Sequence, residues 1–183
     1  MPAETGGLTH VDGRGKARMV DVSRKAPTDR HARARARLVL DPATAERLAS
    51  GKIGDGEALV LAKAAGMLAA KATPRLVPLC HRILLDEVDL DLVVERDGVA
   101  IEATVATRDR TGVELEALAA CLVAALSLFE ACKAEDPGAR IDGAVVLDKA
   151  GGRSGSWHRR DDGTVEHVAA GEPPQAPGDA PGR

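Results

Sequence analysis

Cysteine, histidine, glutamate and lysine occur in three short groups whose spacing suits acid–base or nucleophilic chemistry. Cys80 and His81 are adjacent after Pro78, where they could form a nucleophile with its base or supply two metal ligands. Adjacent side chains point in different directions, however, and no CxxC or HxxxH companion is present. The pattern therefore favours His81 as a lone ligand contact or acid–base group over a Cys80 nucleophile or a zinc site.

The other two groups are carboxylates and a lysine on one predicted helix. Glu114 and Glu116 fall in its first turn, where the positive end of the helix dipole stabilises carboxylates. Glu130 and Lys133 fall in its last turns, three residues apart, which is the spacing of an ordinary surface ion pair. For Glu114 and Glu116 the sequence leaves the structural and the functional roles evenly open, whereas Glu130 with Lys133 is more typical of an ordinary surface pair.

The helix that carries these groups is the longest helical signal in the chain, over residues 111–133. Its large apolar residues recur at steps of three and four and predict one apolar stripe, made of Leu115, Leu118, Leu122, Leu126 and Phe129. Glu116 and Glu130 are about 21 Å apart along the axis at about 1.5 Å per residue, so one small ligand cannot easily touch both ends. Either the two ends have separate roles, or two antiparallel copies in a homo-oligomer each give one end to a shared site.

Length and composition limit the classes of protein that this chain can be. At 183 residues it predicts one domain with a full core. A net charge of −3, with one Phe, one Trp and no Tyr, argues against a nucleic-acid partner. Three cysteines without paired spacing suit a reducing cytoplasm. We see no signal peptide and expect the apolar runs to be too short and too charged to span a bilayer, so a cytoplasmic protein without a membrane partner is predicted.

The elements that must position these groups follow from the periodicity of the chain. Alternation at period two predicts strands over 30–40, 87–96 and 99–108, with Asp97-Gly98 as a hairpin turn between the last two. Asp41-Pro42 predicts the start of a short helix. A second helix is expected over 57–73, with Leu61, Ala65, Leu68 and Ala69 on its packing face, and a last strand over 141–147.

This order predicts an α+β fold of the ferredoxin-like split βαβ type (βαββαβ) with an added short helix. Such a sheet is covered by helices on one face only, so the open face again favours a homo-oligomer. We expect a flexible N-terminal arm over 1–17, a single domain over 18–158 and a disordered tail over 159–183.

Two basic features have weaker functional interpretations. Arg33, Arg35 and Arg37 line one face of the first strand, which is more typical of a solvated face than of a phosphate-binding surface. The glycine-rich loop over 151–155, with Arg153, resembles a phosphate cradle, but it does not open a helix.

Six stretches read in order point to one family. They are residues 19–23 (Met-Val-Asp-Val-Ser), 69–73, 77–81 (Val-Pro-Leu-Cys-His), 111–118 (Thr-Gly-Val-Glu-Leu-Glu-Ala-Leu), 132–134 and 149–155. Together they resemble the cyclic pyranopterin monophosphate synthase family, the MoaC proteins of molybdenum cofactor biosynthesis. The resemblance covers about residues 8–158, and its Pro-Leu-Cys-His and Gly-Val-Glu-x-Glu-Ala-Leu motifs are specific.

The resemblance implies a lyase that acts on 3′,8-cyclo-7,8-dihydro-GTP, which an upstream radical enzyme supplies. The bridged purine is rebuilt as a pyranopterin with a cyclic phosphate, and pyrophosphate is released. Similar proteins are ferredoxin-like homohexamers, trimers of dimers, with the site between subunits. Magnesium is the one cofactor that the resemblance leaves open, and it implies no protein-bound metal.

Carried over position by position, the resemblance assigns roles to ten residues. Glu130 matches the catalytic acid and Lys133 the catalytic lysine. The matches to substrate-binding positions are Leu79, Cys80, His81, Glu114, Leu115, Glu116, Lys71 and Asp21.

The chain also departs from the family pattern. Glu130 stands where aspartate is usual, and Arg82 where proline is usual. More seriously, Asp55 stands where the family has a lysine, for which Lys52 is a candidate substitute. The alternative hypothesis is therefore a divergent paralogue that binds a related nucleotide or acts as a non-catalytic partner.

Overall fold

The computed structural model describes residues 15–152 and 154–168. Most of the predicted N-terminal arm, Arg153, and the last part of the predicted tail lie outside these residues.

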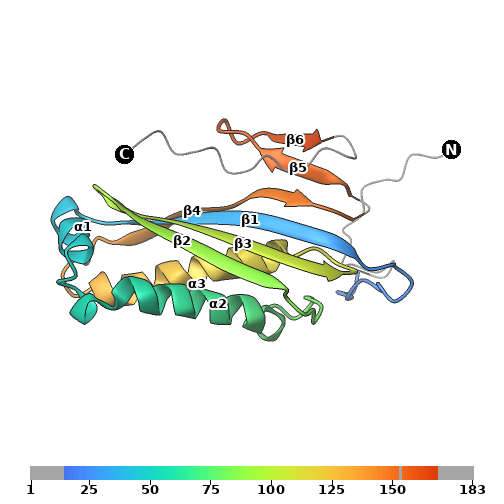
Figure 1. Cartoon of the computed structure of the whole chain (residues 1–183), viewed down its shortest axis with the longest axis horizontal. Helices are drawn as coiled ribbons and strands as arrows, with labels where there is room; N and C mark the ends of the chain where they lie inside the picture. Colours follow the sequence, from blue (N-terminus) through green and yellow to red (C-terminus); the bar gives the residue numbers. More distant parts are fainter. Residues whose placement is uncertain (1–14, 153, 169–183) are drawn as a thin grey trace.

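A single antiparallel sheet, with helices on one of its faces, makes up the described part of the chain (Figure 1). The strands are β1 (Thr28–Val39), β2 (Glu87–Glu95), β3 (Gly98–Asp109), β4 (Arg140–Ala150), β5 (Ser156–Arg159) and β6 (Val165–Val168), in the spatial order β2-β3-β1-β4-β5-β6. The helices are α1 (Pro42–Ala49), α2 (Ala58–Leu76) and α3 (Glu114–Cys132), with a 3₁₀ turn at Gly54–Gly56. From β1 to β4, with α1 set aside, this is the expected order of strand, helix, strand, strand, helix, strand.

Strand β1 is central because alternate small and apolar side chains let it pack under the helices. Ala32, Ala34 and Leu38 are fully buried, as the alternation predicted, and β1 pairs with β3 along its whole length. The hairpin at Asp97-Gly98 is also confirmed. A Cβ atom at Gly98 would lie 2.1 Å from the carbonyl oxygen of Leu38, so only glycine lets the hairpin pass this close to β1.

Strand β2 forms one edge of the sheet. Its apolar side chains face the core, with Leu90 only 1% exposed. Its acidic residues all lie exposed on the other face: Glu87, Asp89, Asp91 and Glu95.

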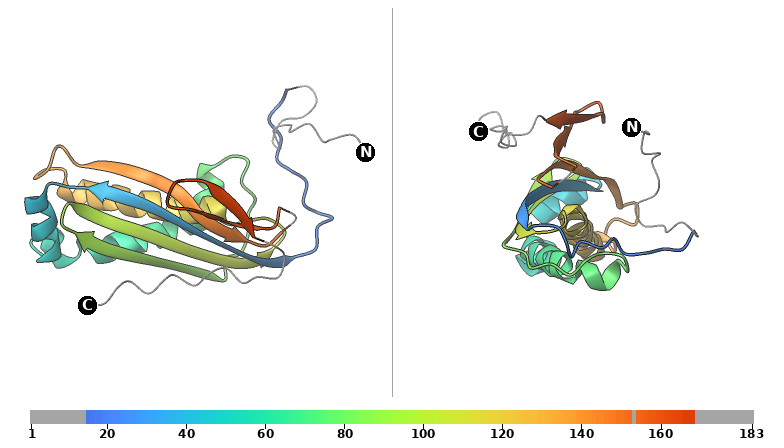
Figure 2. Two further views of the ribbon diagram at one scale, coloured as in Figure 1. Left: turned by 90° about the horizontal axis from the view of Figure 1, so that it is seen from above. Right: turned by 90° about the vertical axis from the view of Figure 1, so that its right-hand side faces the viewer.

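Helices α2 and α3 lie side by side against the sheet (Figure 2). They pack closely because small residues line their contact. Gly66 of α2 lies against Ala120 and Ala124 of α3, with Leu90 of the sheet beside it. Most of the buried positions of the two helices are likewise alanine, glycine or cysteine.

The predicted packing faces of these helices were therefore wrong in part. Ala69 is buried as expected, but Leu61 and Leu68 of α2 are 56% and 67% exposed. On α3, the leucines at 115, 122 and 126 also point outward, and only Leu118 and Phe129 of the predicted stripe pack against the core. The size of the side chains determines which face packs. Helices α2 and α3 lie so close together that a leucine does not fit between them.

Helix α3 also corrects the expectation about membrane-spanning segments. By length and composition alone it is long and apolar enough to cross a bilayer. It packs, however, against α2, β1, β3 and β4 and buries Glu116. Its apolar character is that of a core helix with a second, outward-facing apolar side.

The predicted end of the domain at residue 158 was too early. After β4, the chain forms the β5–β6 hairpin, whose Asp148–His158 and Lys149–Trp157 pairings join it to the sheet. Residues 159–168 were expected to belong to a disordered tail because the end of the chain is rich in Gly, Pro, Ala and acidic residues. The hairpin is held by backbone pairing and by Arg159, which donates to the carbonyl oxygen of Val146 at 2.9 Å.

Adding a methyl group at Gly66 should destabilise the protein. In Gly66→Ala the new Cβ would lie 2.4 Å from Leu90 and 2.8 Å from the backbone oxygen of Ala120, which cannot move independently. We expect a loss of about 1–3 kcal/mol in the free energy of unfolding, measured by urea denaturation at fixed protein concentration. Ala64→Ser, at an exposed position of the same helix, is the control and should change it by about 0.5 kcal/mol or less. A Gly66→Ala protein as stable as the parent would contradict the close contact.

Candidate active site

A buried carboxylate at the start of α3 is the centre of the candidate site. Glu116 is 1% exposed, and one of its oxygens, Oε2, has no hydrogen-bond partner among the described residues. The other, Oε1, accepts a hydrogen bond from the Cys80 thiol at 3.3 Å. Burial raises the pKa of Glu116; hydrogen bonds, including the one from Cys80, lower it by less, and the charge of Glu114 is the smallest of the effects that raise it. Glu116 can therefore hold or release a proton closer to neutral pH than an exposed glutamate.

The environment of Cys80 strongly disfavours the thiolate form at neutral pH. Burial, with the neighbouring Glu116 charge as the second cause, raises the pKa of the Cys80 thiol to about 12. The thiolate is the nucleophilic and metal-binding form. Cys80 is instead a neutral hydrogen-bond donor that orients Glu116.

His81 lies beside the N-terminal segment that precedes β1. Its Nε2 atom is 2.7 Å from the carbonyl oxygen of Val20. A carbonyl oxygen only accepts, so Nε2 carries the proton of this bond. The contact brings His81 next to the segment of Asp21, whose pKa is lowered by a hydrogen bond from the backbone of Ser23.

Lys149, which the sequence analysis did not single out, completes this end of the helix. Its Nζ atom is 3.0 Å from Glu114 Oε1 and donates to Ser154 Oγ at 2.6 Å. The ammonium thus joins the first turn of α3 to the glycine-rich loop. The signal was present in the sequence, because Lys149 is the first residue of the matched stretch 149–155, but its contact with Glu114 depends on the packing of β4 under α3.

A cationic hollow adjoins this loop. It has a volume of about 610 Å³, and its charged lining residues are Asp21, Arg24, Lys25 and Arg30. A Cβ atom at Gly152 would overlap the guanidinium of Arg30, so the glycine lets Arg30 lie directly over the loop. Three cations and one carboxylate suit an anion such as phosphate. The phosphate interpretation of the loop is thus supported by Arg30, which sequence reasoning missed.

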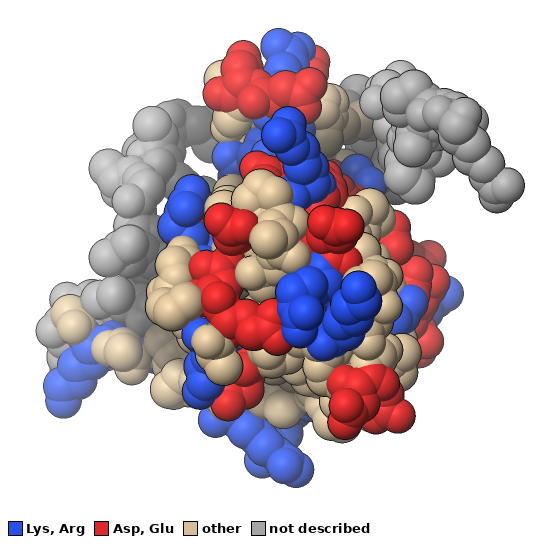
Figure 3. Space-filling view, turned by 90° about the vertical axis from the view of Figure 1, so that its left-hand side faces the viewer, with Lys and Arg blue, Asp and Glu red and all other residues tan. Residues whose placement is uncertain are grey.

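Glu130 and Lys133 lie at the opposite end of α3, where they pair at 2.6 Å. Both are well exposed, at 70% and 49% of the side chain. Arg47 of α1 pairs with Glu135 at 2.6 Å, which brings the loop between α1 and α2, with Lys52 and Asp55, to this same end. Figure 3 faces this end of the molecule and shows basic and acidic side chains gathered there.

The ten predicted site residues therefore fall into two groups within one chain. Leu79, Cys80, His81, Glu114, Leu115 and Glu116 lie around the start of α3, and Asp21 lies in the neighbouring segment. Lys71 is exposed on α2, in the half that leads to Cys80. Glu130 and Lys133 are remote from all of these, as the helix length required.

The arginine row of β1 is engaged in ion pairs at two of its three positions. Arg33 donates to Asp148, and Arg37 pairs with Glu95 and Asp97. These contacts favour the structural interpretation of the row over a phosphate-binding surface. Among residues 15–152 and 154–168, no group of three or more His, Cys, Asp or Glu side chains is arranged to hold a metal ion.

Comparison with known proteins gives the same family for most of the chain. A family model described as the MoaC family matches residues 19–152. Proteins named cyclic pyranopterin monophosphate synthase from Thermomicrobium roseum and Streptomyces avermitilis are 48% and 51% identical, covering 85% and 83% of this chain and 95% and 89% of the relatives. A protein named cyclic pyranopterin monophosphate synthase 2 from Mycobacterium tuberculosis is 48% identical over 85% of this chain and 93% of its own length.

The raised pKa of Cys80 predicts a slow reaction with alkylating reagents. At pH 8, iodoacetamide should modify Cys80 at least about a hundredfold more slowly than free cysteine, because so little thiolate is present. Mass spectrometry of the peptides measures the rate, with urea-unfolded protein as the positive control. Glu116→Gln should speed the reaction by removing the second cause of the shift. Rapid labelling of the native protein would contradict a protonated thiol.

Proposed function

The chain belongs to the MoaC family, and we propose that it catalyses the cyclic pyranopterin monophosphate synthase reaction of molybdenum cofactor biosynthesis. The observation that carries the proposal is the buried Glu116, which accepts a hydrogen bond from Cys80 and has one oxygen without a partner among the described residues. Glu114, in the same turn, pairs with Lys149, and the chain is about half identical to enzymes of that name. The alternative of a divergent paralogue is favoured by no comparable observation.

The chemistry at the start of α3 suits a phosphorylated, protonatable substrate. In the proposed reaction, 3′,8-cyclo-7,8-dihydro-GTP opens and closes again as a pyranopterin with a cyclic phosphate, and pyrophosphate leaves. Arg30 and Lys25 in the hollow supply cations for the phosphates. Glu116, with its raised pKa, and His81 supply groups that hydrogen-bond the base and can move protons.

Glu130 and Lys133 join this site only if a second copy supplies them. We infer a ferredoxin-like homohexamer, a trimer of dimers, in which each site takes the start of α3 from one subunit and the end of α3 from another. The outward apolar side of the helices supports association: Leu126 is 55% exposed and Leu68 is 67% exposed. The assembled lyase would work in the cytoplasm.

Asp55 is compatible with this proposal. It is exposed in the 3₁₀ turn at a φ of 53°, a left-handed backbone conformation that aspartate tolerates better than most residues. Lys52, exposed in the same loop, can supply the missing ammonium at this end. A magnesium requirement stays a prediction. We propose that any such ion arrives bound to the substrate phosphates, so EDTA would lower activity by removing the ion from the substrate.

Turnover can be measured in a coupled assay. The upstream radical enzyme makes the cyclised GTP in place, and pyrophosphate release and pterin fluorescence are followed together. We expect turnover by the parent protein and a loss of about a hundredfold or more in Lys133→Ala and Glu130→Gln, which remove a reacting group. Lys52→Ala should also lose activity if Lys52 takes the role of the family lysine that Asp55 replaces in this chain.

Asp55→Lys separates the two hypotheses. An active parent that gains little from this change supports the synthase with its substitute lysine. Activity that appears only in Asp55→Lys would establish the paralogue, and folded protein inactive in both forms would overturn the assignment.

Mixing two inactive variants tests the shared site. Glu116→Gln removes a group at the start of α3, and Lys133→Ala removes one at its end. In a dimer of one variant with the other, one of the two sites therefore combines an unchanged start with an unchanged end. Equal amounts of the two variants, unfolded and refolded together, should regain about a quarter of parent activity by random pairing. The control mixes Glu116→Gln with Glu114→Gln, which spoil the same end and should regain nothing. No recovery in the first mixture would show that a site does not combine opposite ends of α3.

A further inference from the structure

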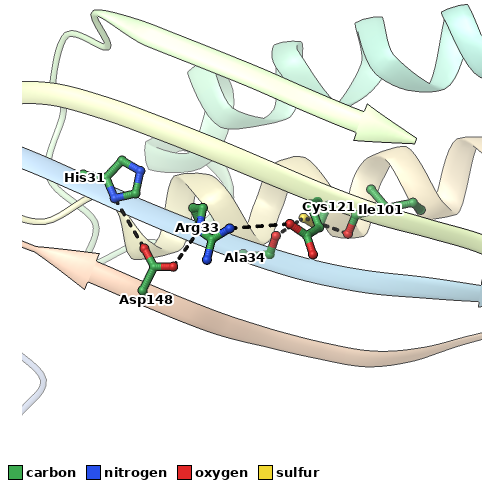
Figure 4. Close-up of polar contacts among 7 residues, drawn as sticks. His31, Arg33, Ala34, Ile101, Cys121 and Asp148 are labelled. Atoms are coloured by element: carbon green, nitrogen blue, oxygen red, sulfur yellow. Dashed lines mark hydrogen bonds and ion pairs between the residues drawn. The ribbon is translucent and has the colours of Figure 1, made fainter. Parts of the chain in front are cut away.

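Asp148 lies behind the candidate site, on the other face of the sheet. Asp148 and Lys149 are neighbours on β4, and successive side chains of a strand point to opposite faces. Lys149 points toward α3, where it meets Glu114. Asp148 points to the face that the helices leave open, as Figure 4 shows, and takes no part in the site itself.

The Asp148 carboxylate ties β4 to β1. Its side chain is 8% exposed, and Arg33 Nε donates to Oδ2 at 2.6 Å (Figure 4). His31 Nδ1 lies 3.4 Å from Oδ1, and neither atom has a hydrogen-bond partner of good geometry among the described residues. Arg33 also lies 3.9 Å from Glu102, and His158, which faces Asp148 from β5, is paired with Glu166. A largely buried charge-assisted bond of this kind is stronger than an exposed pair.

The backbone around Lys149 is paired on both sides, but over short stretches. Lys149 pairs with Ala32 of β1 on one side and with Trp157 of the short strand β5 on the other. Three register pairs join β4 to β1 here, from His31–Ala150 to Arg33–Asp148, before an irregularity between Arg33 and Ala34 shifts the register. Beyond Ala150 the chain turns at once through Gly151, at a φ of 92°. The pairing with β5 also covers only Asp148 and Lys149, so the Asp148 side chain adds a contact to β1 where the regular pairing of β4 is short.

We propose that Asp148 is a positioning residue for the reaction: through its bond with Arg33 it fixes β4 so that the Lys149 ammonium bridges Glu114 and the glycine-rich loop. This inference rests on the proposed function for its consequence in turnover, but the positioning itself is independent of it. A displacement of a reacting or charge-stabilising group by about 1 Å can cost about a hundredfold in rate.

Kinetics of Asp148 variants test the consequence. Asp148→Asn should lower kcat/KM at least about tenfold, and Asp148→Glu, which can still reach Arg33, should restore most of it. Asp142→Asn is the matched control, an exposed carboxylate on the same strand paired with Arg140, and should stay within about twofold. In a Lys149→Ala background, Asp148→Asn should add no further loss. Full activity of Asp148→Asn, or an additive loss in that background, would overturn the proposal.

An NMR signal tests the positioning without any substrate. After reductive ¹³C-methylation, the Lys149 signal is identified by its absence in Lys149→Arg, and Glu114→Gln shows how it moves when the pair is lost. Asp148→Asn should move it in the same direction while Asp142→Asn leaves it unchanged; an unmoved signal in folded Asp148→Asn would refute the proposal. If the parent protein fails to turn over but the signal behaves as expected, the proposed function falls and the positioning role stands.

Discussion

The close approach of α2 to α3 at Gly66 is the constraint on which the rest of the structure depends. A glycine and a row of alanines bring the two helices together over the sheet. The same approach carries the end of α2 to the start of α3, so that the Cys80 thiol reaches Glu116. It also turns the leucines of both helices outward, because no room is left for them inside. The contact between α2 and α3 thus positions the residues of the candidate site and also leaves an apolar outer surface that an oligomer would cover.

Glu116 shows what that packing imposes on the site. A carboxylate that is removed from water with one oxygen unsatisfied is costly to the folded protein, and such groups persist where function requires them. The thiol of Cys80 compensates only one oxygen. Among the described residues the remaining oxygen has no partner, so a ligand group that reached it would form a hydrogen bond without displacing any of them.

Local patterns predicted the parts of this structure that depend on local geometry. The alternation of β1, the Asp97-Gly98 hairpin and the helix start at Asp41 were all recoverable, because each has its own period or turn signal. The outward leucines were not, because hydropathy does not reveal how near the next helix lies. Lys149 and Arg30 were missed for a related reason, since their contacts join segments that are far apart in sequence. The β5–β6 hairpin has strands too short for a periodic signal and is held by pairing with β4.

The edge strand β2 bears on how copies of the chain can meet. An exposed strand edge is a template on which another strand can add, and proteins prevent this with charge. If the β2 strands of two copies paired, the exposed row of Glu87, Asp89, Asp91 and Glu95 on one would face the same row on the other, and like charges directly opposite each other repel. Continuous sheets running from subunit to subunit through this edge are thereby disfavoured, as is fibre growth along it. An oligomer of the proposed kind would therefore use another surface, and the uncharged leucines on the outer side of the helices offer one.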